Sequence, residues 1–161
     1  MLSVIFVCLG NICRSPMAEA VFREMVNRRG LGLSFDISSR GTSDEEEGNH
    51  IYPPAARTLR AHGIPADHIS TQLTKREVVN ADYVLVMDAG NLFDVLRLTG
   101  GQYGEKIFKL SYFSGLPRDV ADPWFTRDFE RAYSDIYAGG EGVLNYLLTE
   151  RAELFGYDSR H

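Results

Sequence analysis

Residues 4–20, VIFVCLGNICRSPMAEA, decide the fold of this chain, because they place a cysteine-containing polar loop between a strand and a helix. The apolar run at 4–7 predicts a buried strand, and Pro16 suits the first turn of a helix. A tight loop between a strand and a helix directs backbone N–H groups and the positive helix end at one point. The stretch therefore predicts an anion-binding loop in an α/β protein.

The same loop contains a nucleophile and a cation. Five residues separate Cys8 from Arg14, and a guanidinium has the donor geometry for bidentate phosphate binding. The positive field of the loop favours the thiolate form of Cys8, which is the nucleophilic form. Cys8 could instead be a buried structural cysteine and Arg14 a surface residue. Their spacing at a predicted helix start favours the catalytic interpretation.

The remaining chain alternates between predicted strands and helices. Hydrophobic periodicity predicts strands at 2–8, 33–39, 83–87 and 107–110, and helices at 16–29, 54–62, 75–80, 91–98 and 129–155. Loops are expected at 41–51 and 112–123, and a bend or break in the last helix at Gly139, Gly140 and Gly142. This order predicts an α/β, doubly wound, four-stranded parallel sheet with helices on both faces. Ligands bind such sheets beyond the carboxyl ends of the strands.

Length and composition predict one ordinary domain over residues 1–161. A net charge of −5 without a basic cluster argues against nucleic-acid binding. The apolar runs are too short to span a bilayer and no signal peptide pattern is present, so we expect a cytoplasmic protein with no membrane partner. The two cysteines lie in the loop and the four histidines show no ligand spacing, so we expect no metal and no cofactor.

Residues 7–20 closely resemble the N-terminal signature of low-molecular-weight protein tyrosine phosphatases. The resemblance implies a phosphate-binding loop after the first strand, with Ser15 bonded to the thiolate and Asn11 holding the loop in shape. The sequence alone also allows Ser15 to be a helix N-cap and Asn11 to be a left-handed residue. The substrate-binding residues implied in this loop are Leu9, Gly10, Asn11, Ile12, Cys13 and Ser15.

The hydrolysis of phosphotyrosine that the resemblance implies also needs an acid, because the phenolate that leaves has to be protonated. Asp122, in the segment ADPWF at 121–125, resembles the family's Asp-Pro followed by two aromatic residues. Asp-Pro is also a common turn signal, and Asp119 is the nearest rival, although no proline follows it. Trp124 and Phe125 are expected to line the mouth of the site and pack against the substrate ring.

Three supporting residues are implied by the resemblance alone. Asp88, in the segment DYVLVMD at 82–88, resembles an aspartate that orders the general-acid side of the site. It could equally cap the next helix. Ser39 aligns with a serine that supports the loop. His68 aligns with a histidine that bonds the loop asparagine, although a solvated histidine is the alternative.

Two further features of the sequence bear on regulation and specificity. Cys13 could form a reversible disulfide with Cys8 or simply fill space behind the loop. The chain departs from the family at Glu45, Glu46 and Glu47, where a bulky residue is common. An acidic rim there would disfavour acidic phosphopeptides, unless these charges form only a solvated run.

The resemblance and these residues together imply metal-independent hydrolysis of phosphotyrosine in proteins, with inorganic phosphate as product, and we expect a monomer or weak dimer. Cys8 is the expected nucleophile, Arg14 the phosphate clamp and Asp122 the general acid and base. The alternatives are a protein arginine phosphatase and a non-catalytic phosphate- or phosphopeptide-binding module on the same fold. Arginine phosphatases of this type carry Thr where this loop has Ile12, and a binding module would need neither Cys8 nor Asp122.

Overall fold

A four-stranded parallel sheet forms the centre of the computed structural model, which describes residues 1–155. Residues 156–161 of the predicted domain lie outside the described residues. The strands, in the spatial order β2-β1-β3-β4, are β1 (Leu2–Cys8), β2 (Phe35–Gly41), β3 (Tyr83–Val86) and β4 (Ile107–Lys109).

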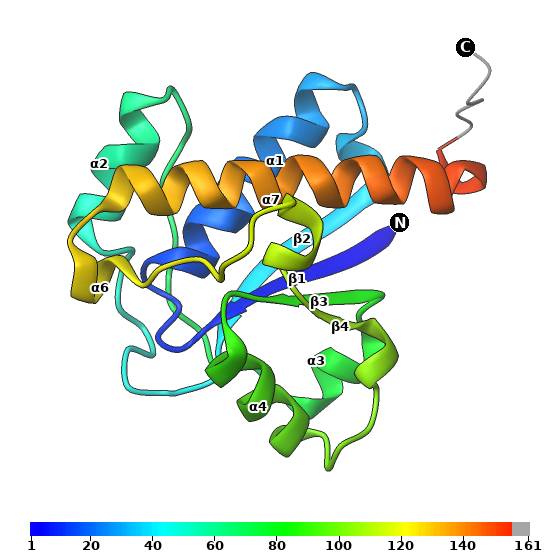
Figure 1. Cartoon of the computed structure of the whole chain (residues 1–161), viewed down its shortest axis with the longest axis horizontal. Helices are drawn as coiled ribbons and strands as arrows, with labels where there is room; N and C mark the ends of the chain where they lie inside the picture. The colour runs from blue at the N-terminus through cyan, green and yellow to red at the C-terminus, as the bar shows by residue number, and fades with distance from the viewer. Residues whose placement is uncertain (156–161) are drawn as a thin grey trace.

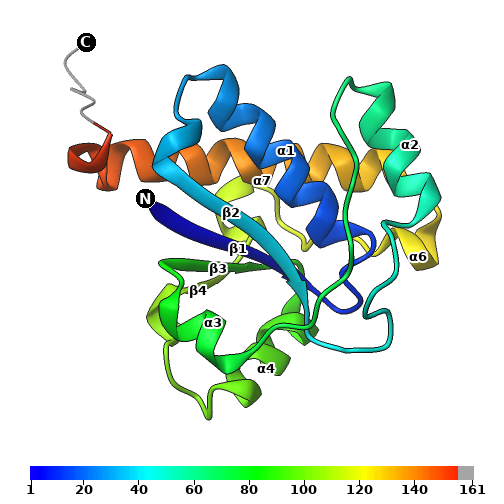
Figure 2. The same ribbon diagram turned by 180° about the vertical axis from the view of Figure 1, so that it is seen from behind.

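Helices cover both faces of this sheet. They are α1 (Arg14–Arg28), α2 (Pro53–Ala61), α3 (Lys75–Asn80), α4 (Ala89–Leu98), α5 (Ser111–Ser114), α6 (Pro123–Thr126) and α7 (Phe129–Glu150). Figure 1 shows α1, α2 and α7 on one side of the sheet and α3 and α4 on the other, and Figure 2 shows the same layers from behind. The prediction of a single-domain, doubly wound parallel sheet is confirmed.

The alternation of side chains along β1 explains why both faces are covered. Val4 and Phe6 belong to the apolar cluster that includes α1 and α7, whereas Ile5 and Val7 belong to the cluster that includes α3 and α4. Phe6 packs edge-on against Phe22 of α1, with the ring centroids 5.5 Å apart. A central parallel strand that is apolar on both sides needs a helical layer on each side.

The predicted break in the last helix is wrong. Helix α7 runs without interruption through Gly139, Gly140 and Gly142. A Cβ atom at Gly139 would overlap Leu110, and one at Gly142 would overlap the main-chain carbonyl of Phe113. The glycines therefore allow α7 to pack closely against its neighbours, and this packing outweighs their low helix propensity.

Several predicted boundaries also differ from the structure. The second strand begins at Phe35 because Gly32–Ser34 form a 3₁₀ turn in which Leu33 is 93% exposed. The short helix α5, Ser111–Ser114, extends into the loop that was predicted for residues 112–123. Helix α7 ends at Glu150, before the predicted end at residue 155, and a 3₁₀ turn at Ala152–Leu154 follows. Within residues 1–155, no helix has the length and apolar character needed to cross a bilayer.

The topology fixes where the loop between β1 and α1 lies, which runs from Cys8 to Arg14 and is called the signature loop below. Strands β2 and β3 flank β1 on opposite sides. The chain therefore adds β2 on one side of β1 and then crosses over to add β3 and β4 on the other side, so the order of the strands reverses between β1 and β3. Val7 of β1 pairs with Val86 of β3, so the segments that follow Cys8 and Val86 leave the sheet side by side. This is the crevice at which open α/β sheets bind ligands.

Candidate active site

The signature loop folds back over the sulfur of Cys8. The backbone N–H of Asn11 donates to Cys8 Sγ at 3.3 Å. Asn11 adopts φ +58°, so the left-handed conformation considered from the sequence is present. Asparagine tolerates this region better than most residues, and the turn directs the Asn11 N–H at the sulfur.

The side chain of Asn11 also ties the loop to its surroundings. It is fully buried, and its Nδ2 donates to Ser15 Oγ at 2.8 Å and to Ser39 Oγ at 3.0 Å. Its Oδ1 accepts from the backbone N–H of Thr71 at 3.0 Å and lies 2.9 Å from His68 Nε2. Because the Thr71 N–H can only donate, these contacts fix the orientation of the amide. Asn11 therefore has both features considered from the sequence.

Ser15 lies behind the sulfur of Cys8. The Ser15 Oγ is 3.0 Å from Cys8 Sγ and 3.4 Å from the carbonyl oxygen of Arg40. Since Ser15 accepts an N–H from Asn11, its own hydrogen is free to point at the nearer sulfur. The N-cap alternative for Ser15 is wrong, because α1 begins at Arg14 and Cys13 occupies the cap position. Helix α1 thus begins directly at the end of the loop.

Arg14 is buried, so the surface-arginine alternative is wrong. Only 3% of the residue is exposed. Its Nη1 donates to Asp88 Oδ2 at 2.9 Å and to the carbonyl oxygen of Val120 at 3.0 Å, and its Nη2 lies 3.5 Å from Asp122 Oδ2. A buried guanidinium needs such acceptors, and they hold it in the floor of the cavity beside Cys8.

Asp88 both caps the next helix and contacts the site, which are the two alternatives considered from the sequence. Its Oδ1 accepts from the backbone N–H of Asn91 at 2.8 Å and caps α4. Its Oδ2 binds Arg14. Capping and support of the site are therefore compatible, because each uses a different oxygen.

Asp122 and its rival Asp119 lie in different environments. Asp122 caps α6 through Oδ1, which accepts from the Trp124 N–H at 3.0 Å, and its other oxygen faces Arg14. Asp119 instead binds Lys109 Nζ and Ser111 Oγ, each at 3.1 Å. Asp122 lines the cavity beside Cys8, whereas Asp119 does not.

A cavity of about 290 Å³ lies over the signature loop. It is lined by Cys8, Leu9, Gly10, Ile12, Cys13, Arg14, Glu45, Glu46, Asp122, Trp124 and Phe125. Trp124 and Phe125 are 48% and 80% exposed. The other predicted site residues, Asn11, Ser15, Ser39, His68 and Asp88, do not line it and contact the residues that do or their partners. Within residues 1–155, no group of three or more metal-ligating side chains could hold a metal ion.

Some contacts at the site were not predicted. Ser70 Oγ donates to the carbonyl oxygen of Gly10 at 2.9 Å, and Glu19 Oε1 accepts from Ser39 Oγ at 2.8 Å. The ring of Tyr52 lies 5.0 Å from that of Trp124. Ser70 and Tyr52 belong to segments with no local motif of their own, and although Glu19 lies in the signature, its partner Ser39 is on another strand, so the fold is needed to make these contacts.

Cys13 carries a buried thiol. Burial, reinforced by the nearby Cys8, raises the pKa of the Cys13 thiol to about 12. Cys13 is therefore a neutral thiol at physiological pH and a poor nucleophile. Both cysteines are free in the structure, and the space-filling and redox interpretations of Cys13 both remain compatible with its position.

His68 is held in its neutral form. Burial lowers the pKa of His68 below its ordinary 6.5, and Arg40 and Arg23 act in the same direction, although Glu19 and the bond to Asn11 oppose them. The Nε2 atom faces two acceptors, Asn11 Oδ1 at 2.9 Å and the Asn11 carbonyl oxygen at 3.2 Å. The neutral ring therefore carries its hydrogen on Nε2.

This state of His68 predicts a loss of stability in mild acid. Because its pKa is lower in the folded than in the unfolded chain, the stabilisation is complete above about pH 6.5 and is lost as the pH falls below it. We expect the free energy of unfolding to fall more steeply between about pH 7.5 and 5.5 in the wild type than in His68→Gln. Urea unfolding at each pH measures this free energy, and replacement of the exposed His50 by glutamine is the control. Parallel curves for the wild type and His68→Gln would contradict the assignment.

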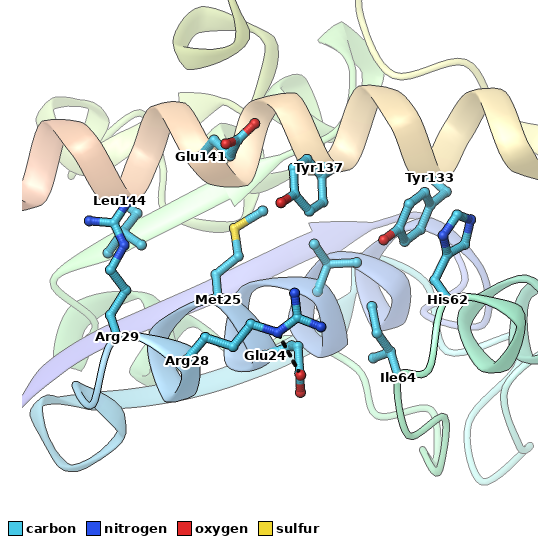
Figure 3. A pocket seen from close by; sticks show the side chains of 11 residues that line it. Glu24, Met25, Arg28, Arg29, His62, Ile64, Tyr133, Tyr137, Glu141 and Leu144 are labelled. Carbon is cyan, nitrogen blue, oxygen red and sulfur yellow. Dashed lines mark hydrogen bonds and ion pairs between the residues drawn. The ribbon is translucent and has the colours of Figure 1, made fainter.

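A larger cavity, of about 410 Å³, lies between α1 and α7, away from the loop (Figure 3). On one side Arg28 pairs with Glu24 at 3.0 Å, and on the other Tyr133 stacks on His62 with the ring centroids 3.8 Å apart. Neither cysteine lines it. Size alone does not make a catalytic site, so the smaller cavity beside Cys8 is the candidate active site.

Comparison with known proteins agrees with this geometry. A family model described as "Low molecular weight phosphotyrosine protein phosphatase" matches residues 3–153. The low molecular weight protein-tyrosine-phosphatase PtpA of Staphylococcus saprophyticus is 33% identical over 151 residues, which are 93% of this chain and 96% of PtpA. The crystal structure of YfkJ from Bacillus subtilis is 34% identical, with a TM-score of 0.91, over 94% of this chain and 97% of YfkJ. The drosophila arginine phosphatase DARP is 27% identical, with a TM-score of 0.84, over 91% of this chain and 98% of DARP.

Proposed function

The chain belongs to the family of low molecular weight phosphotyrosine protein phosphatases, and from this premise we propose that it hydrolyses phosphotyrosine in proteins through a phosphocysteine intermediate. The observation that carries the proposal is the convergence of Cys8, Arg14 and Asp122 on one cavity. The loop N–H groups and Arg14 supply the positive field for the phosphoryl group, so the reaction needs no metal ion.

In the first step the sulfur of Cys8 attacks phosphorus in line with the leaving oxygen. The S–P bond forms while the P–O bond to the phenol breaks, and protonated Asp122 transfers its proton to the departing oxygen. Arg14 and the loop N–H groups stabilise the charge on the phosphoryl oxygens in the transition state. The position of Arg14 between Asp88 and Val120 supports this role, because a guanidinium that is already oriented needs no rearrangement.

In the second step a water molecule attacks the phosphocysteine. Asp122, now a carboxylate, accepts a proton from this water while the S–P bond breaks, and inorganic phosphate is released. The Cys8 thiolate that leaves is stabilised by the hydroxyl of Ser15, 3.0 Å away, and by the Asn11 N–H.

An arginine phosphatase is the second candidate, because DARP, a drosophila arginine phosphatase, is similar along most of the chain. Ile12 argues against it. This side chain lines the cavity, has no polar atom to bond a guanidinium, and offers an apolar wall to a phenyl ring.

Hydrolysis of phosphotyrosine and phosphoarginine peptides of the same sequence tests the choice. We expect kcat/KM for the phosphotyrosine peptide to be higher by at least about tenfold in the presence of EDTA, because the apolar wall discriminates by roughly 1–3 kcal/mol. The rate of phosphate release from each peptide decides between the tyrosine and the arginine phosphatase. A preference for phosphoarginine would replace tyrosine by arginine in the proposed function.

The acidic residues at the rim suggest which phosphotyrosine peptides are preferred. Glu45 and Glu46 line the cavity. Within residues 1–155 neither carboxylate forms an ion pair, and Glu46 accepts a hydrogen bond only from the neutral Asn49 amide. We expect peptides with basic residues beside the phosphotyrosine to have a kcat/KM about fivefold higher per favourable contact than acidic ones, since an exposed pair is worth up to about 1 kcal/mol.

A charge-reversal variant tests this preference. Glu45→Lys/Glu46→Lys is expected to favour the acidic peptide instead, and the difference is expected to shrink at high salt because exposed charges are screened. The matched control is Glu105→Lys/Glu150→Lys, which changes the net charge equally but does not touch the cavity. Equal kcat/KM for acidic and basic peptides at low salt in the wild type would reject the preference.

A further inference from the structure

The segment that carries Asp122 is irregular from Gly115 to Asp122 and is attached to the rest of the molecule at separate points. Toward β4, Asp119 binds Lys109 and Ser111. Toward α7, Arg118 Nη2 donates to Asp135 Oδ1 at 2.8 Å. Within residues 1–155, no other side-chain hydrogen bond joins this segment to α7.

Asp135 is an unusual residue on α7. It lies on the buried face of the helix and is only 4% exposed. One of its oxygens binds Arg118, and the other, Oδ2, has no hydrogen-bond partner within the described residues. A buried carboxylate is costly unless it is paired, so Asp135 strongly favours the conformations in which Arg118 stays beside it.

Arg118 is close along the chain to two groups of the site. Two residues later, the carbonyl oxygen of Val120 accepts from Arg14 Nη1 at 3.0 Å, and the Val120 N–H donates to the Met87 carbonyl oxygen at 3.2 Å. Four residues later, Asp122 faces Arg14 Nη2 at 3.5 Å. A shift of the segment at Arg118 would therefore move both the acceptor that orients Arg14 and the carboxyl group of Asp122.

We propose that the Arg118–Asp135 pair is a positioning device that holds the segment of residues 115–122 so that Asp122 reaches the leaving oxygen. This inference rests on the proposed function, because it assumes that Asp122 protonates the phenolate. Arg118 and Asp135 are positioning residues. Neither lines the cavity, and they act through Val120 and Asp122.

The leaving group makes the proposal measurable. p-Nitrophenolate leaves with little protonation, whereas unsubstituted phenolate needs the acid. In Arg118→Gln we expect kcat/KM for phenyl phosphate to fall about tenfold further than that for p-nitrophenyl phosphate, because a displacement of about 1 Å at the reacting groups can cost about 10²-fold. We also expect the alkaline limb of the pH profile of kcat/KM to flatten, since a displaced acid no longer controls the rate.

Two further variants separate positioning from general damage to the fold. Arg118→Lys keeps a cation beside Asp135 and is expected to restore most of the lost selectivity. Arg118→Leu/Asp135→Leu removes both partners, avoids an uncompensated buried charge, and is expected to show the same change in leaving-group dependence as Arg118→Gln. Arg28→Gln, which breaks the Arg28–Glu24 pair on α1, is the matched control.

The outcomes distinguish this proposal from the proposed function. Wild-type turnover that requires Cys8 tests the proposed function, and the ratio of the two substrates tests the pair. Equal losses for both substrates in Arg118→Gln, with an unchanged shape of the pH profile, would overturn the positioning role while leaving the phosphatase intact. A folded wild type that hydrolyses neither substrate would overturn both.

Discussion

Replacement of Cys8 by serine is expected to lower the hydrolysis of p-nitrophenyl phosphate by at least about 10⁴-fold, as losses of catalytic nucleophiles do. The serine hydroxyl would occupy the same place, within reach of Ser15 and the Asn11 N–H. It would nevertheless remain protonated, since these contacts stabilise a thiolate and provide no base for an alcohol. Cys13 cannot replace the lost thiolate, because burial still raises the pKa of its thiol when Cys8 is replaced.

The measurement is turnover between about pH 5 and 8 with EDTA present, on reduced protein, with equal melting temperatures for the two forms as the control for folding. Turnover of the wild type that disappears in Cys8→Ser would establish the cysteine mechanism. If the folded, reduced wild type showed no turnover, the loop would bind oxyanions without catalysis, and the binding-module alternative would take its place. Substantial activity in Cys8→Ser would place the nucleophile elsewhere.

The signature loop could be predicted from the sequence because its parts are contiguous. The proposed nucleophile, the guanidinium and the helix start all lie within residues 8–16, so local geometry alone brings them together. The alternation of apolar strands and helices likewise indicated the two-sided sheet, since buried parallel strands have a simple pattern. Neither feature depends on contacts between distant segments.

Other features could not be predicted because they depend on distant contacts. The bond between Arg14 and Asp88 joins positions 74 residues apart, and that to the Val120 carbonyl oxygen joins positions 106 apart. A main-chain acceptor has no sequence signature at all. The predicted break at the glycines of α7 was wrong for a related reason, because helix propensity takes no account of the close packing of Gly142 against Phe113. Contacts between distant segments determine both the orientation of Arg14 and the continuity of α7.

Replacement of Asp122 by asparagine is the second change with a large expected effect. Asparagine can still accept the Trp124 N–H that caps α6, so the backbone of the segment is expected to stay in place. It cannot donate a proton to the leaving phenolate. We expect kcat/KM for phenyl phosphate to fall by about 10²–10⁴-fold, the usual contribution of a general acid, and that for p-nitrophenyl phosphate to fall much less.

The matched control for this prediction is Asp119→Asn. Asp119 lies on the same segment and carries the same chemistry, but its carboxylate is bonded to Lys109 and Ser111 and does not line the cavity. Both bonds are made by Oδ1, an acceptor that asparagine retains, so the segment is expected to stay anchored. We therefore expect Asp119→Asn to lower kcat/KM similarly for both substrates and by less than about tenfold, since it removes no proton donor. The pH profile gives a second readout, because loss of Asp122 removes the alkaline limb of kcat/KM whereas loss of Asp119 leaves its shape unchanged. A selective loss with phenyl phosphate in Asp119→Asn, and none in Asp122→Asn, would transfer the role of general acid to Asp119 despite its position.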